Sequence, residues 1–118
     1  MTDSGNLRAL IPLKSGRTQL VVINSDTNTV GSSEIREVWS IGYRGSSVSA
    51  QTAMMLLTEN ESKVLGSWSV VKSDNNYFAS FAVRLDADTS PQKLIEAIGI
   101  SAQVADELEQ RLTQKDDY

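Results

Sequence analysis

The residues best suited to chemistry lie in the second half of the chain. Ser90 and Lys93 have the S-x-x-K spacing in which a lysine activates a nucleophilic serine, and Ser73-Asp74-Asn75 matches the S-D-N motif that accompanies it. Here the two motifs occur in reverse order, no K-T-G follows, and 118 residues are too few for the fold that carries them. A helix cap at Ser90 and a turn at Asp74-Asn75 explain these residues without catalysis.

Asp86 and Asp88 are oxygen donors of the kind that hard cations prefer. No D-x-D-x-D-G loop or distal glutamate accompanies them, so a polar linker between a strand and a helix is the simpler interpretation. The chain also has no histidine and no cysteine, which removes the commonest general base, the commonest transition-metal ligands and thiol nucleophiles. We therefore expect a protein that is not an enzyme, with no catalytic residue, cofactor or metal.

The charge distribution indicates which partners are unsuitable. The net charge is −4, and residues 61–118 carry ten acids against six bases. Such a surface repels phosphate backbones, so we expect no nucleic-acid partner. No segment has the run of about 18 apolar residues that spans a membrane, and the polar N-terminus is not typical of a signal peptide. We expect a soluble, cytoplasmic protein.

Five segments have the composition of β-strands. The clearest is 77–85, where Tyr77, Phe81 and Leu85 alternate with polar or small residues. Pro12 cannot donate to a neighbouring strand, which predicts that the first strand lies at a sheet edge. The other four predicted strands are 7–13, 18–23, 34–43 and 67–72, and the polar segment 24–33 is predicted as a loop.

The third predicted strand has an irregular pattern. Alternation over 34–43 places Trp39 and Tyr43 on one face together with Ile35 and Ile41. Glu37 falls on that same apolar face, which indicates a β-bulge or a frayed start.

Two helices complete the predicted elements. The first covers 48–59, after a serine cap, and has no Gly or Pro. The second begins at Thr89-Ser90-Pro91, with proline in its favoured first position. Gly99, with Ser101 available as a new cap, predicts a break or kink in this second helix. The chain then forms a single α+β domain over 1–118 with the order β-β-β-α-β-β-α, in which helices cover one face of a five-stranded antiparallel sheet. Residues 1–6 and 114–118 are predicted to be a loose tail and a polar tail.

The first predicted helix carries the sharpest functional hypothesis. Its Ala53-Met54-Met55-Leu56-Leu57 run is apolar around most of the circumference, whereas a surface helix normally has one apolar stripe. Met is common on adaptable binding surfaces, so Met54, Met55 and Leu57 are candidate partner or dimer contacts. The alternative is that the sheet and the second helix cover them. The aromatic residues Trp39, Tyr43 and Trp68 have the same two interpretations, core packing or anchors for a partner.

Three stretches of the chain resemble the bacterial YbjN family: 64–70 (VLGSWSV), 86–91 (DADTSP) and 105–112 (ADELEQRL), with an acidic ending that also fits. The resemblance covers roughly residues 39–118. It implies a fold similar to that of type III secretion chaperones, which are small, acidic, often dimeric α+β proteins that bind polypeptide. The family is described as sensory or regulatory, and it supplies no catalytic residue.

We therefore expect a homodimeric, chaperone-like or adaptor domain that binds a polypeptide through helix 48–59 and an exposed sheet face or edge, with Leu7–Leu13 as one candidate edge for strand addition. The alternative is a regulatory domain that senses a small molecule in a pocket lined by aromatics such as Trp39 and Trp68.

Overall fold

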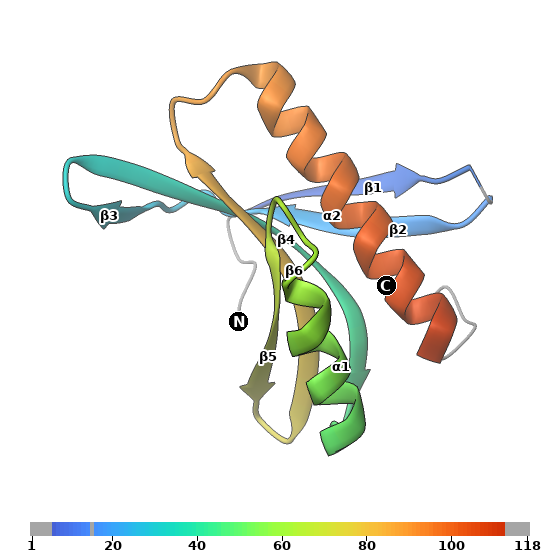
Figure 1. The fold of residues 1–118 in the computed structure, drawn as a ribbon. Helices are drawn as coiled ribbons and strands as arrows, with labels where there is room; N and C mark the ends of the chain where they lie inside the picture. Colours follow the sequence, from blue (N-terminus) through green and yellow to red (C-terminus); the bar gives the residue numbers. More distant parts are fainter. Residues whose placement is uncertain (1–5, 15, 113–118) are drawn as a thin grey trace.

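The computed structural model describes residues 6–14 and 16–112, which form one sheet and two helices (Figure 1). The predicted α+β class with an antiparallel sheet is confirmed, but the predicted five strands are wrong, because a short strand within 24–33 adds a sixth. The tails predicted at 1–6 and 114–118 lie outside the described residues except for Asn6. The strands are β1 (Leu7–Pro12), β2 (Thr18–Ile23), β3 (Asn28–Val30), β4 (Ser33–Gly45), β5 (Ser67–Ser73) and β6 (Asn76–Asp86), and the helices are α1 (Ala50–Asn60) and α2 (Pro91–Leu112).

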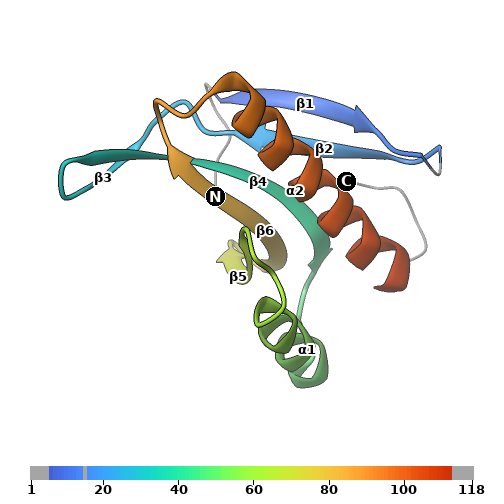
Figure 2. The same cartoon turned by 45° about the horizontal axis from the view of Figure 1, so that its top comes forward.

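The sheet has the strand order β1-β2-β4-β6-β5, and β3 pairs with the start of β4. All pairs are antiparallel. The edges of the main path are therefore β1, as Pro12 predicted, and β5. Figure 2 shows α2 lying across the curved sheet, while α1 lies beside the β5–β6 hairpin.

Both helices pack on the same face of the sheet. Leu56 of α1 and Leu108 of α2 share one buried cluster with Trp68 and Phe81, whose rings meet edge to face with centroids 5.4 Å apart. Burial of these large side chains supplies the main apolar stabilisation of this half of the molecule.

α2 approaches β4 closely because small residues line the contact. A Cβ atom at Gly42 would lie 2.9 Å from the carbonyl oxygen of Ala105 and 3.1 Å from the Cβ of Leu108. Ala97, Ala102 and Ala105 on the facing side of α2 are fully buried. Glycine at position 42 therefore allows the helix to lie against the strand.

A register shift between Ile41 and Tyr43 changes the face of the sheet toward which the later side chains of β4 point. The predicted shared face for Trp39 and Tyr43 is wrong, because Tyr43 packs against the helix-covered cluster while Trp39 belongs to a cluster with Val22 and Ala82. Neither the bulge nor the frayed start predicted from Glu37 occurs there, because the register of β4 with β6 is regular from Ile35 to Ile41. Glu37 itself is opposite Arg84 of β6 and forms an ion pair with it at 2.9 Å.

The second helix begins as predicted and continues further than predicted. Ser90 Oγ accepts a bond from the backbone N–H of Lys93 at 3.3 Å, and Pro91 is the first helical residue. The predicted break at Gly99 is wrong, because α2 continues to Leu112. Gly99 is exposed and packs against nothing within 4 Å of a Cβ, so its flexibility is restrained by the buried face of the helix around it.

A buried ion cluster joins the β1–β2 hairpin to α2. Arg17 Nε donates to Asp106 at 2.8 Å, and its Nη2 donates to Glu109 at 2.9 Å. The side chains of Asp106 and Glu109 are only 7% and 0% exposed. Two carboxylates in such a position need a cation, and Arg17 supplies it. Neither helix in the described part of the chain has the length and apolar content to cross a membrane.

Candidate functional site

The exposed face of α1 carries two large apolar side chains, Met54 and Leu57, beside the polar Gln51 and Thr58. Ser49 caps the helix by accepting a bond from the backbone N–H of Thr52 at 3.0 Å, and the helix has no charged residue before Glu59. Leu56 is buried against the sheet, whereas Met54 and Leu57 are each 64% exposed. The sequence pattern that indicated too wide an apolar arc thus corresponds to large apolar side chains in contact with solvent.

The exposed face of α1 continues onto the edge strand β5. Val70 of β5 is 43% exposed. A cavity of about 270 Å³ lies between the two elements and is almost entirely apolar. We use the name α1–β5 surface for Met54 together with the residues that line this cavity, which are Ala53, Leu56, Leu57, Trp68, Ser69 and Val70.

The outer edge of β5 carries an amide group from α1. The backbone N–H of Trp68 donates to Asn60 Oδ1 at 2.7 Å, and Asn60 Nδ2 donates to the carbonyl oxygen of Trp68 at 3.1 Å. One residue of a neighbouring antiparallel strand would make the same two bonds. Trp68 therefore directs its backbone groups away from β6. Strict alternation along β5 directs those of Val70 and Lys72 to the same outer edge.

The six candidate residues predicted from sequence lie in three environments. Met54 and Leu57 are exposed on the α1–β5 surface, and Trp68 lines its cavity from the core, where it is 3% exposed. Met55 and Tyr43 are partly buried against the helix-covered cluster. Trp39 is 5% exposed and lies in the cluster with Val22 and Ala82. Trp39 and Trp68 thus belong to different clusters, which is a correction to the predicted aromatic-lined pocket.

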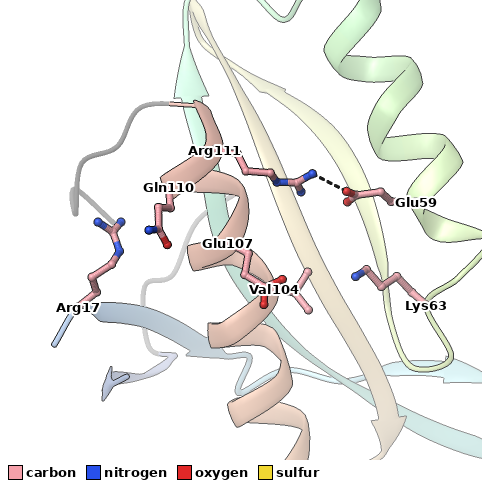
Figure 3. Close-up of a pocket in the computed structure, with 7 residues that line it drawn as sticks. All are labelled: Arg17, Glu59, Lys63, Val104, Glu107, Gln110 and Arg111. Carbon is pink, nitrogen blue, oxygen red and sulfur yellow. Dashed lines mark hydrogen bonds and ion pairs between the residues drawn. The ribbon is translucent and has the colours of Figure 1, made fainter. Parts of the chain in front are cut away.

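A second concave region, the charged groove, lies between α1 and α2 (Figure 3). Its volume is about 700 Å³. Arg111 crosses from α2 and donates to Glu59 Oε1 at 2.7 Å, which links the two helices. In Figure 3 the side chain of Lys63 extends toward α2, where Glu107 lies. The lining residues are Arg17, Glu59, Lys63, Val104, Glu107, Gln110 and Arg111.

Glu59, in the charged groove, has a lowered pKa. The hydrogen bond from Arg111 lowers the pKa of Glu59 below its ordinary value of 4.5. Partial burial of the carboxylate opposes this change with a smaller effect. The positive charges of Arg111 and Lys63 and a hydrogen bond from Trp68 lower the pKa further. The indole Nε1 of Trp68 donates to the other carboxylate oxygen at 3.2 Å. Glu59 is therefore held ionised between the core and α2, where it positions the end of α1.

The sequence did not predict two candidate functional residues at the edge of β5, Val70 and Asn60. Val70 and Val71 are adjacent apolar residues, so one of them must lie on each face of β5, and this pattern could have indicated Val70. Asn60 gives no signal in the sequence, because its role depends on the loop that returns the chain to β5.

The α1–β5 surface and the adjoining edge of β5 offer apolar contact and outward backbone hydrogen-bonding groups, which are suited to binding polypeptide. Comparison with protein-family models, with curated proteins and with solved structures gave no match.

Proposed function

We propose that this chain is a non-catalytic polypeptide-binding domain, chaperone-like or an adaptor in regulation, which holds its partner on the α1–β5 surface. The observation that carries the proposal is the exposure of two large apolar side chains, Met54 and Leu57, on α1. They lie beside the edge strand β5, and the surrounding helix surface has no charged residue before Glu59. An exposed apolar group of this kind marks interaction sites on small domains. The resemblance of residues 39–118 to the YbjN family supports the same function.

The test measures binding to a permanently unfolded polypeptide, reduced and carboxymethylated α-lactalbumin. The wild type should bind it, and the double variant Met54→Glu, Leu57→Glu should bind at least about tenfold more weakly, since burying one such side chain contributes about 1.5–3 kcal/mol. Ile95→Glu is the matched control, because Ile95 is 67% exposed on α2, away from the α1–β5 surface. Circular dichroism should show that all three proteins are folded.

Two results would contradict the proposal. If the double variant binds as tightly as the wild type, the partner does not use α1. If Ile95→Glu weakens binding as much as the double variant does, the effect reflects overall charge and not a specific surface.

The charged groove supports a second candidate function, a regulatory domain that senses a small molecule. Its volume of about 700 Å³ falls in the range of ligand sites. Facing cationic and anionic side chains, Lys63 and Glu107, favour a zwitterionic metabolite such as an amino acid. A ligand that binds only the folded chain raises its melting temperature, so a thermal-shift screen of amino acids tests this function. The ligand-induced rise in melting temperature should disappear in Lys63→Ala and persist in the Met54→Glu, Leu57→Glu variant.

A further inference from the structure

We infer that the partner is an extended segment with the pattern acidic-x-apolar, which adds to the sheet as an antiparallel strand beside β5. This inference rests on the proposed function, because it specifies how the α1–β5 surface holds a polypeptide. The acidic side chain would lie opposite Lys72 and the apolar side chain opposite Val70.

Asn60 marks the place of the added strand. Its side-chain amide makes both hydrogen bonds that a neighbouring strand would make at Trp68. The next outward positions on the same edge are Val70 and Lys72, and their N–H and C=O groups point in the direction that the Trp68 groups take. Groups spaced two residues apart along an edge are matched by an extended backbone, which identifies the occupant as a strand.

The side chains beside this edge specify what the strand must carry. Val70 lies on the same face as Trp68, and both line the apolar cavity that Leu57 and Ala53 cover from α1. A residue opposite Val70 therefore points toward this cavity, and leucine or a similar side chain suits its volume of about 270 Å³.

Lys72 determines the charge of the partner. Its side chain is exposed, with the ammonium nitrogen 5.7 Å from the centre of the Tyr77 ring, and it forms no ion pair with any carboxylate of residues 6–14 and 16–112. An acidic residue directly opposite is the favourable cross-strand neighbour. In an antiparallel strand the residue opposite Lys72 precedes the residue opposite Val70 by two positions, which gives the order acidic-x-apolar.

The same charge disfavours a second copy of this chain at this edge. Asn60 already occupies the outward groups of Trp68, so two β5 edges could pair only through Val70 and Lys72. Any symmetric pairing over those residues brings two Lys72 side chains into opposite or diagonal positions on one face. Like charges so placed are destabilising.

The experiment titrates ¹⁵N-labelled chain with the capped peptide acetyl-Thr-Thr-Glu-Thr-Leu-Thr-Thr-amide and follows the backbone amides by NMR. The Val70 and Lys72 amide signals should shift most and exchange more slowly with solvent. The peptide with reversed order, acetyl-Thr-Thr-Leu-Thr-Glu-Thr-Thr-amide, should bind at least about tenfold more weakly, because it loses the cross-strand ion pair and directs glutamate instead of leucine toward the apolar cavity. N-methylation of the Leu nitrogen should abolish binding, because it removes a backbone donor.

A charge exchange provides the internal control. Lys72→Glu should prefer the peptide in which lysine replaces glutamate, whereas Lys93→Glu, at an exposed lysine of α2, should keep the wild-type preference. Loss of all peptide binding in Lys72→Glu, with no gain for the lysine peptide, would overturn the proposed pairing.

Three other outcomes would overturn the inference. They differ in whether the proposed function also falls. If unfolded α-lactalbumin binds through Met54 and Leu57 but no peptide shifts the Val70 and Lys72 amides, the surface binds polypeptide by another mode. If those two amides shift when the chain alone is concentrated, a second copy occupies the edge. If neither α-lactalbumin nor any peptide binds, both proposals fall.

Discussion

At the scale of single residues, Arg17 joins the β1–β2 hairpin to α2 through two buried carboxylates. It lies just before β2 and donates to Asp106 and Glu109 of α2, at distances of 2.8 and 2.9 Å. The two carboxylates are shielded from water, and breaking a buried ion pair is strongly destabilising. Arginine suits this position because its planar group can donate to two acceptors at once.

Replacement of Arg17 by alanine should lower the free energy of unfolding by about 3–5 kcal/mol, because it removes a cation that donates to two buried acids. Urea unfolding at neutral pH measures this change. Arg84→Ala is the control, since it breaks an ion pair in which Arg84 is 61% exposed, and it should cost less than about 1 kcal/mol. Equal losses in the two variants would show that the buried cluster contributes no more than a surface pair.

Glu59 should make part of the stability depend on pH. Its pKa is lowered in the folded state, so its contribution is present above the unfolded pKa and is lost as the pH falls through the folded pKa. The difference in unfolding free energy between the wild type and Glu59→Gln should be constant above about pH 5 and should shrink below about pH 4.5. Urea unfolding of both proteins across this range tests the prediction, and a difference that does not change with pH would contradict it.

The sequence could identify candidate residues but could not place them. The run from Ala53 to Leu57 has too many apolar positions for one buried stripe, yet only the packing of α1 on β5 determines that Met54 is exposed and Met55 partly buried. The Arg17 cluster has no local signal, because its partners are 89 and 92 residues away. Such pairs follow from the topology of the sheet and not from spacing along the chain.

At the scale of elements, the contact between α2 and β4 depends on the absence of a side chain at Gly42. Gly42→Ala should lower the unfolding free energy by about 1–3 kcal/mol, because the added methyl group would overlap Ala105 and the Trp68 ring. Gly99→Ala is the matched control in the exposed middle of α2, where nothing lies within 4 Å, and it should raise stability by about 0.5–1 kcal/mol. Thermal and urea unfolding measure both changes, and the same sign for both would contradict this account.

The sequence predicted elements well where packing agrees with local pattern. The alternation in 77–85 identified β6, and the Ser90-Pro91 cap located the start of α2. β3 was missed because Asn28–Val30 is short, polar and exposed, and only its pairing with β4 makes it a strand. The predicted break at Gly99 failed because propensity at one residue is outweighed by the burial of the helix on both sides of it.

At the scale of the whole molecule, the predicted homodimer and the predicted partner would compete. A dimer that packs α1 against α1 would cover Met54 and Leu57 without joining the two β5 edges. Light scattering across a dilution series should show a dimer that dissociates when unfolded α-lactalbumin is added, and the Met54→Glu, Leu57→Glu variant should be monomeric throughout. A complex that contains two copies of this chain together with α-lactalbumin would show that the two surfaces differ.

The ion cluster at Arg17 also has a consequence for synthesis on the ribosome. The β1–β2 hairpin leaves the ribosome before its carboxylate partners, which follow 89 and 92 residues later. At ordinary translation rates this interval is roughly 5–20 seconds. Throughout it the nascent hairpin lacks the helix that covers its apolar side, so its open edges are exposed to neighbouring nascent chains until α2 emerges and docks.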